Sequence, residues 1–158
     1  MKTIVRKKYL DRIIELNGTP DIKIITGIRR SGKSKLMQAY MEYLKANFED
    51  INIIFIDFMD LAFEEIKEYH ALHSYVEQHY AAGKTNYLFV DEVQMCPKFE
   101  LAINSLYSKG KYDIYVTAVS YTHLDVYKRQ LQSRMAQGLL PVYLSMLACV
   151  FRVLLPGQ

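Results

Sequence analysis

The sequence predicts an α/β fold built on a mostly parallel sheet, and two observations support this prediction. Short apolar, β-branched segments alternate with amphipathic segments along most of the chain. The segments 51–58 and 87–90 are almost unbroken apolar runs, which are typical of parallel strands covered by helices on both faces. This alternation implies right-handed crossovers and therefore a doubly wound sheet.

Composition is typical of a soluble globular domain. The 158 residues suffice for one domain with a proper core, and the net charge of +3 is too small and too scattered to favour a nucleic-acid partner. Cys96 and Cys149 form neither a disulfide framework nor a CxxC pattern. Asp11, Arg12 and Glu15 interrupt the apolar core that a signal peptide needs, so a cytoplasmic location is expected.

The first element expected is a packing helix over 5–16, which the Asn-Gly-Thr-Pro segment at 17–20 ends. An alternative for this helix is that Arg6 or Tyr9 lies near an adenine ring, although a tyrosine at helical spacing usually belongs to the core. The following elements are expected, in chain order, as strand 22–26, helix 33–47, strand 51–58, helix 64–80, strand 87–90, helix 98–109 and strand 112–117.

Residues 27–34 read G-x-x-x-x-G-K-S and stand between an expected strand and an expected helix, as a phosphate-binding loop must. Glycines at both ends let the backbone N–H groups face inward as an anion nest, and the helix dipole points at the same anion. Lys33 is suited to bridging the β- and γ-phosphates and Ser34 to ligating Mg²⁺. An ordinary glycine-containing turn is the less favoured alternative. The expected nucleotide contacts are Gly27, Arg30, Ser31, Gly32, Lys33, Ser34 and Lys35.

Two acids, Asp91 and Glu92, end the apolar run 87–90. The carboxyl end of a buried parallel strand opens into the crevice where ligands bind. Asp91 is suited to holding the water shell of Mg²⁺, and Glu92 to taking a proton from the attacking water. A strand that simply ends in a solvated acidic turn is the alternative. Gln94 either positions that water or is a plain loop amide, and the residues leave both possibilities open.

The strand 112–117 is expected to lie between the strand before the phosphate loop and the strand before the acids. In nucleotide motors with a glutamate base, this insertion gives the spatial order first, fourth, third, second. The polar tip of the inserted strand normally senses the γ-phosphate, and Thr117 is the candidate for that role.

The segments GIRRSGKSKLM, IDFMDLAFEEI, YLFVDEVQMCPKFELAINSLY and YDIYVT together resemble the prokaryotic AAA-type ATPases that carry a domain of unknown function behind the motor. The resemblance covers residues 1–117 and implies a P-loop NTPase three-layer sandwich, ATP rather than GTP, Mg²⁺ and hydrolysis. Lys33, Ser34, Asp91 and Glu92 match the family's nucleotide and catalytic positions. The resemblance further implies that hydrolysis moves a protein partner or a trailing domain.

The resemblance stops after Thr117, and the string SYTHLDVYKRQ at 120–130 resembles a translated sequencing adapter. The expectation is therefore an incomplete ATP-binding core over 1–117, truncated after the fourth core strand, and a non-family tail over 118–158. A polar sensor would be expected where Val119 stands, and an arginine finger is expected to be absent. The apolar run 139–155 is close to the lower limit for a membrane span of about 17 residues, but a membrane anchor is disfavoured.

The sequence therefore predicts Mg-ATP binding and hydrolysis, with a catalytically inactive ATP-binding fragment or a nucleotide-responsive binding module as the alternative. A GTPase is disfavoured because the sequence has no N-K-x-D guanine reader and Asp91 does not begin a D-x-x-G switch. A small-molecule kinase is disfavoured because an acid directly follows Asp91 and no arginine-rich lid follows.

Overall fold

The computed structural model describes residues 2–119 and 142–145 of the chain. Strands and helices alternate, as the sequence predicts, and the helix expected at 33–47 has those same bounds. In chain order the elements are α1 (Lys2–Glu15), β1 (Lys23–Gly27), α2 (Lys33–Asn47), β2 (Ile51–Asp57), the 3-10 helix η1 (Leu61–Ile66), α3 (Tyr69–Gln78), β3 (Thr85–Asp91), the 3-10 helix η2 (Val93–Met95), α4 (Phe99–Ser108), β4 (Tyr112–Val119) and β5 (Val142–Ser145).

The sheet has the order β2-β3-β4-β1-β5, and all its strand pairs are parallel. The predicted order of the first four strands is confirmed, with β4 inserted between β1 and β3. In the register, Asp57 pairs with Asp91 and Ile25 with Thr117. The carboxyl ends of β1 to β4 therefore lie along one edge of the sheet, which we call the carboxyl edge.

The sheet has a fifth strand, β5, beyond the four that the sequence predicts. β5 pairs in parallel with β1, from Lys23 opposite Val142 to Thr26 opposite Ser145. Without this partner, β1 would leave a row of unpaired backbone N–H and C=O groups at a sheet edge. β4 also continues past Thr117 as far as Val119, which pairs with Gly27.

The adapter-like string at 120–130 lies outside the described residues, as does most of the apolar run 139–155. Among the residues that are described, no helix has the length and apolar character to cross a membrane.

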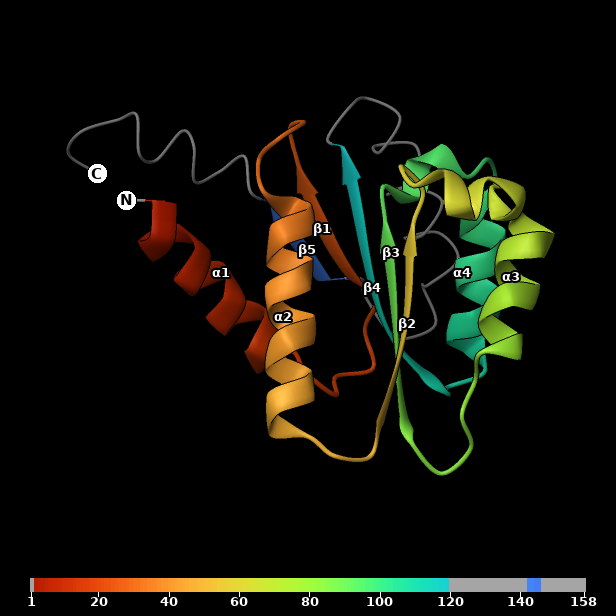
Figure 1. Cartoon of the computed structure of the whole chain (residues 1–158), viewed down its shortest axis with the longest axis horizontal. Helices are drawn as coiled ribbons and strands as arrows, with labels where there is room; N and C mark the ends of the chain where they lie inside the picture. Colours follow the sequence, from red (N-terminus) through yellow and green to blue (C-terminus); the bar gives the residue numbers. More distant parts are fainter. Residues whose placement is uncertain (1, 120–141, 146–158) are drawn as a thin grey trace.

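Helices cover both faces of the sheet, with α1 and α2 on one face and α3 and α4 on the other (Figure 1). Alternate strand residues enter two separate cores, so Tyr87 and Phe89 of β3 pack toward α2, whereas Leu88 and Val90 pack toward α3 and α4. Burying one such side chain stabilises the fold by about 1.5–3 kcal/mol. Tyr9 of α1 is 8% exposed and packs in the α2 core, which favours the interpretation of α1 as a packing helix.

The single helix expected at 64–80 is wrong, because the segment forms η1 and then the shorter α3. Two acidic side chains cap the two helices. Asp60 accepts a hydrogen bond from the N–H of Ala62 at 2.9 Å, and Glu68 accepts one from the N–H of Ala71 at 3.1 Å. Caps of this kind satisfy N–H groups that a helix start leaves unpaired, so each one favours a new start at its own position.

A buried ion pair joins β1 to β4 at the opposite, amino edge of the sheet. Lys23 Nζ lies 2.5 Å from Asp113 Oδ1 and donates to the carbonyl of Thr19 at 2.6 Å. Asp113 Oδ2 accepts from the N–H of Gly18 at 3.1 Å and from the hydroxyl of Tyr115 at 3.0 Å. Asp113 thereby fixes the turn before β1 against β4.

Candidate functional site

The loop between β1 and α2 has the backbone of an anion nest. Arg30 has φ 61° and Gly32 has φ 95°, and both values lie in the left-handed region. Gly32 is the N-cap of α2, and as a glycine it offers no side chain to the first N–H groups of the helix. These N–H groups and the positive end of the helix dipole are therefore available to an anion.

Lys33, the first residue of α2, has only 3% of its surface exposed. Its Nζ donates to the carbonyls of Gly27 at 3.1 Å and Ile28 at 2.9 Å. Burial lowers the pKa of Lys33 below its usual 10.5, and the negative charges of Glu92 and Asp91 act in the opposite direction. The structure therefore brings the lysine and both acids close enough to interact electrostatically.

The other residues expected to contact the nucleotide differ in exposure. Ser31 Oγ is buried and has no hydrogen-bond partner among the described residues. A buried hydroxyl without a hydrogen-bond partner destabilises the fold, and a phosphate oxygen would supply the missing acceptor. Ser34 is half-buried, whereas Arg30 and Lys35 are exposed. The loop therefore offers an anion the buried ammonium group of Lys33 and the buried hydroxyl of Ser31.

The two acids are fixed by hydrogen bonds at the end of β3. Asp91 is 3% exposed, and its Oδ1 accepts a hydrogen bond from Thr117 Oγ1. The N–H of Glu92 donates to that same Thr117 Oγ1 at 2.9 Å. Glu92 has φ 55° and ψ 51°, a left-handed conformation that is uncommon for residues other than glycine. Gln94 Nε2 donates to Glu92 Oε2, so in this structure its amide binds the carboxylate directly.

Strand alternation places Asp91 and Thr117 on the face of the sheet that carries α2. Asp91 follows Phe89 by two residues and Thr117 follows Tyr115 by two, and both of these aromatic residues pack in the α2 core. The N-terminus of α2 lies at the carboxyl edge of the same face (Figure 1). The phosphate loop and the acids thus lie at the same edge and on the same face of the sheet.

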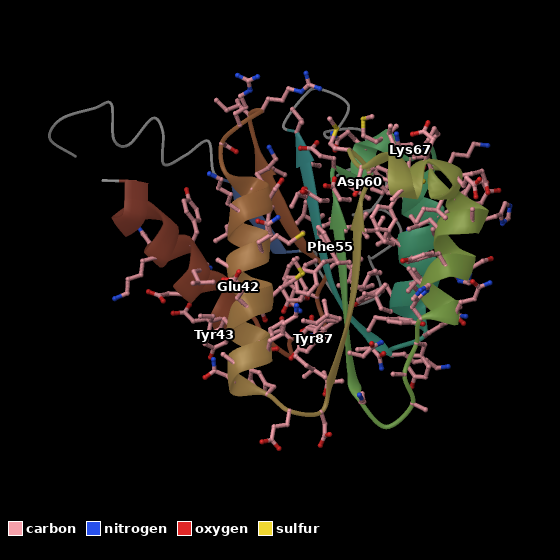
Figure 2. The ribbon with its side chains drawn as sticks, in the orientation of Figure 1. Glu42, Tyr43, Phe55, Asp60, Lys67 and Tyr87 are labelled. Carbon is pink, nitrogen blue, oxygen red and sulfur yellow. The ribbon has the colours of Figure 1, made fainter. Side chains whose placement is uncertain are left out.

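Asp57 is a further acid at this edge of the sheet that sequence reasoning missed. It ends β2, pairs with Asp91 in the register and follows Phe55 by two residues, so it lies on the same face. Phe55 and Tyr87, labelled in Figure 2, lie on the α2 side of the sheet. Counting by two from Phe55 would have identified Asp57. Its Oδ1 accepts a hydrogen bond from the N–H of Met59 at 2.9 Å.

The donor set suits Mg²⁺ carried by a nucleotide better than a metal held by protein alone. In the described part of the chain, no group of three or more His, Cys, Asp or Glu side chains could hold a metal ion. Mg²⁺ commonly binds one or two protein oxygens together with substrate phosphates and water. The Ser34 hydroxyl and the Asp91 carboxylate are donors of this type.

A cavity of about 520 Å³ lies at the amino edge, away from the loop and the acids. Its lining includes Gly18, Lys84, Lys111 and Asp113. Because ligands of parallel α/β sheets bind at the carboxyl ends of the strands, this cavity is not the candidate site.

Comparison with known proteins adds one sequence relative and several structural ones. The chain is 28% identical over 116 residues to an uncharacterized protein of Haemophilus influenzae, and the match covers 72% of this chain but 29% of that protein. The chain thus spans less than a third of this relative's length.

Solved structures resemble the fold. A chain of the Drosophila ORC structure bound to AT-rich DNA and Cdc6 has a TM-score of 0.63 at 8% identity, covering 92% of this chain and 56% of that chain. AMPPCP-bound DnaA from Aquifex aeolicus has a TM-score of 0.53 at 19% identity, covering 88% of this chain and 44% of that chain. At these identities the likeness shows the fold alone.

The family assignment comes from the sequence match that covers most of the chain. Residues 19–151 match the model of the AAA domain, past the boundary expected at residue 117. This match includes the four strands β1 to β4, and β5 as well. The chain therefore belongs to the AAA domain family.

Proposed function

We propose that the chain binds Mg-ATP at the carboxyl edge of the sheet and hydrolyses it to ADP and phosphate. The observation that supports this most strongly is that Lys33, at the start of α2, and Asp91 and Glu92, at the end of β3, lie at the carboxyl edge of the sheet, close enough for both acids to act on the charge of Lys33. One buried cation beside an anion nest suits a polyphosphate, and two acids at the neighbouring strand end suit a metal and a base.

In this proposal the loop N–H groups and Ser31 Oγ bind phosphate oxygens. Lys33 exchanges its hydrogen bonds to the carbonyls of Gly27 and Ile28 for bonds to the β- and γ-phosphates. The exposed side chains of Arg30 and Lys35 lie where they contribute positive potential at the mouth of the site. Binding is expected to weaken with salt because it depends on these charges.

Hydrolysis is a water attack on the γ-phosphorus. Glu92 takes the proton of that water, the bond from the γ-phosphorus to the β,γ-bridging oxygen breaks, and ADP leaves with the bonding electrons. Mg²⁺, held by Ser34 and through Asp91, would neutralise charge on the phosphate oxygens. Gln94 Nε2 donates to Glu92 Oε2, and the carboxylate has further lone pairs on its two oxygens that can accept the proton.

The experiment that tests this function combines a Mg-ATP binding titration with a phosphate-release assay on the wild-type chain and Glu92→Gln. We expect wild-type binding and phosphate release, and in Glu92→Gln unchanged binding with release reduced at least 100-fold, since a general base contributes about 10²–10⁴-fold. Equal loss of both in Glu92→Gln would refute the assignment of Glu92 as the base.

A nucleotide-responsive binding module is the second candidate, and the bond from Gln94 Nε2 to Glu92 Oε2 favours it because this bond restrains the carboxylate of the proposed base. In that case the wild-type chain would bind Mg-ATP without releasing phosphate. Gln94→Ala would then turn on release if the amide is what restrains Glu92.

The work coupled to hydrolysis is also a proposal, since the chain spans 29% of its sequence relative. We propose a protein partner or a further domain in the cytoplasm. The Drosophila ORC structure is bound to AT-rich DNA, but the net charge of +3 in the present chain does not favour such a partner.

A further inference from the structure

We propose that Thr117 is a positioning residue that locks Asp91 and Glu92 into their working geometry, rather than a contact to the γ-phosphate. The effect on turnover rests on the proposed function, whereas the structural lock can be tested without it. Thr117 is fully buried at the carboxyl edge, on the face that carries α2.

The hydrogen bonds of Thr117 support this role. A threonine hydroxyl has one proton to donate and two lone pairs to accept with. Thr117 Oγ1 gives its proton to Asp91 Oδ1 and accepts the N–H of Glu92 at 2.9 Å. A phosphate oxygen accepts hydrogen bonds but does not donate them. Thr117 could therefore bind a phosphate only by breaking its hydrogen bond to Asp91 Oδ1.

The backbone of Glu92 shows why such a lock is needed. The left-handed conformation at φ 55° and ψ 51° is unfavourable for a residue with a Cβ, and it persists only where the surroundings hold it. The bond from the N–H of Glu92 to Thr117 is a contact of this kind. It turns the chain at the end of β3, so that Glu92 leaves the line of the strand.

The position of Thr117 in the sheet also connects the acids to the strand that precedes the phosphate loop. β4 lies between β3, which carries the acids, and β1, which carries the phosphate loop. Thr117 pairs with Ile25, two residues before that loop begins. One side chain thus fixes both acids relative to the strand that positions Lys33.

The test compares Thr117→Val, which keeps the shape but loses both hydrogen bonds, with Thr117→Ser, which keeps the hydroxyl. Thr85→Val, at the exposed start of β3, is the matched control. Amide hydrogen exchange of Glu92 in the nucleotide-free chain should accelerate at least tenfold in Thr117→Val and stay within threefold of wild type in Thr117→Ser and Thr85→Val. Unchanged exchange at Glu92 in Thr117→Val would overturn the proposal.

The kinetic arm separates positioning from phosphate sensing. Thr117→Val should lower kcat at least tenfold while the ratio of ATP to ADP affinity stays within twofold, and Thr117→Ser should restore kcat. A selective loss of ATP affinity would instead identify Thr117 as a γ-phosphate contact and overturn the proposal. If Thr117→Val does not fold, Thr117→Ala provides the same comparison. A wild-type chain without turnover would refute the proposed function. The exchange experiment would still test whether Thr117 holds the backbone of Glu92 in place.

Discussion

Replacing Lys33 with methionine is expected to separate nucleotide binding from folding. The lysine is 3% exposed, donates to two loop carbonyls and has a lowered pKa caused mainly by burial. Methionine has a similar length and is well suited to a buried site. We expect Lys33→Met to fold normally and to bind Mg-ATP weakly.

The expected changes in ATP affinity and in the free energy of unfolding are worked out separately. A hydrogen bond from a charged group to phosphate contributes about 1.5–3 kcal/mol, so ATP affinity should fall about 10- to 150-fold. In the free chain, losing the bonds to the Gly27 and Ile28 carbonyls is offset by removing a buried charge. The free energy of unfolding should therefore stay within about 1 kcal/mol of wild type.

The pH dependence has a definite sign. Because the pKa of Lys33 is lowered on folding, the unfolded chain binds more protons between that pKa and 10.5. Wild-type stability relative to Lys33→Met should thus be lowest at neutral pH and rise as pH approaches 10.5. Lys45→Met, at the exposed end of α2, is the control.

Isothermal titration with Mg-ATP and urea unfolding at two pH values measure these effects. If Lys33→Met kept wild-type ATP affinity, Lys33 would not be a phosphate ligand. If affinity and stability collapsed together, the loss of binding would report misfolding, and the expected separation of binding from folding would be refuted.

Three further predictions concern stability and reactivity. Asp113→Ala should cost about 3–5 kcal/mol in urea unfolding because it leaves Lys23 buried without its counter-charge, and Lys23→Met combined with Asp113→Leu should cost less; a double variant as unstable as Asp113→Ala would contradict this. Glu68→Ala should cost about 0.5–2 kcal/mol through the lost cap of α3, and an unchanged unfolding midpoint would contradict it. Burial raises the pKa of Cys96 to about 11, so in a Cys149→Ser background iodoacetamide at pH 8 should alkylate Cys96 only after unfolding; rapid labelling of the folded chain would contradict this.

The sheet could be predicted, and the main residues of the candidate site proposed, because their signals are local. The pattern from Gly27 to Ser34 fixes a strand, a loop and a helix together, and the acids after an apolar run mark the carboxyl end of a strand. The order β2-β3-β4-β1 then followed from the expected insertion of the fourth strand, and the structure confirms it.

What the sequence did not predict depends on distant partners. The break between η1 and α3 needs caps from Asp60 and Glu68, and acidic residues there fit a continuous helix equally well by pattern. β5 is recognised through its pairing with β1, which lies more than 110 positions away in the sequence. The hydrogen bonds of Thr117 to the acids likewise depend on the register of two strands.

Backbone amide NMR during titration with Mg²⁺ and a non-hydrolysable ATP analogue tests most directly where the nucleotide binds. We predict that the amides of residues 31–35 and of Glu92 shift together with one common midpoint, and that removing Mg²⁺ selectively reduces the shift at Glu92. Shifts confined to the amino-edge cavity, at Lys84 and Lys111, with unchanged loop amides would contradict the proposed binding site.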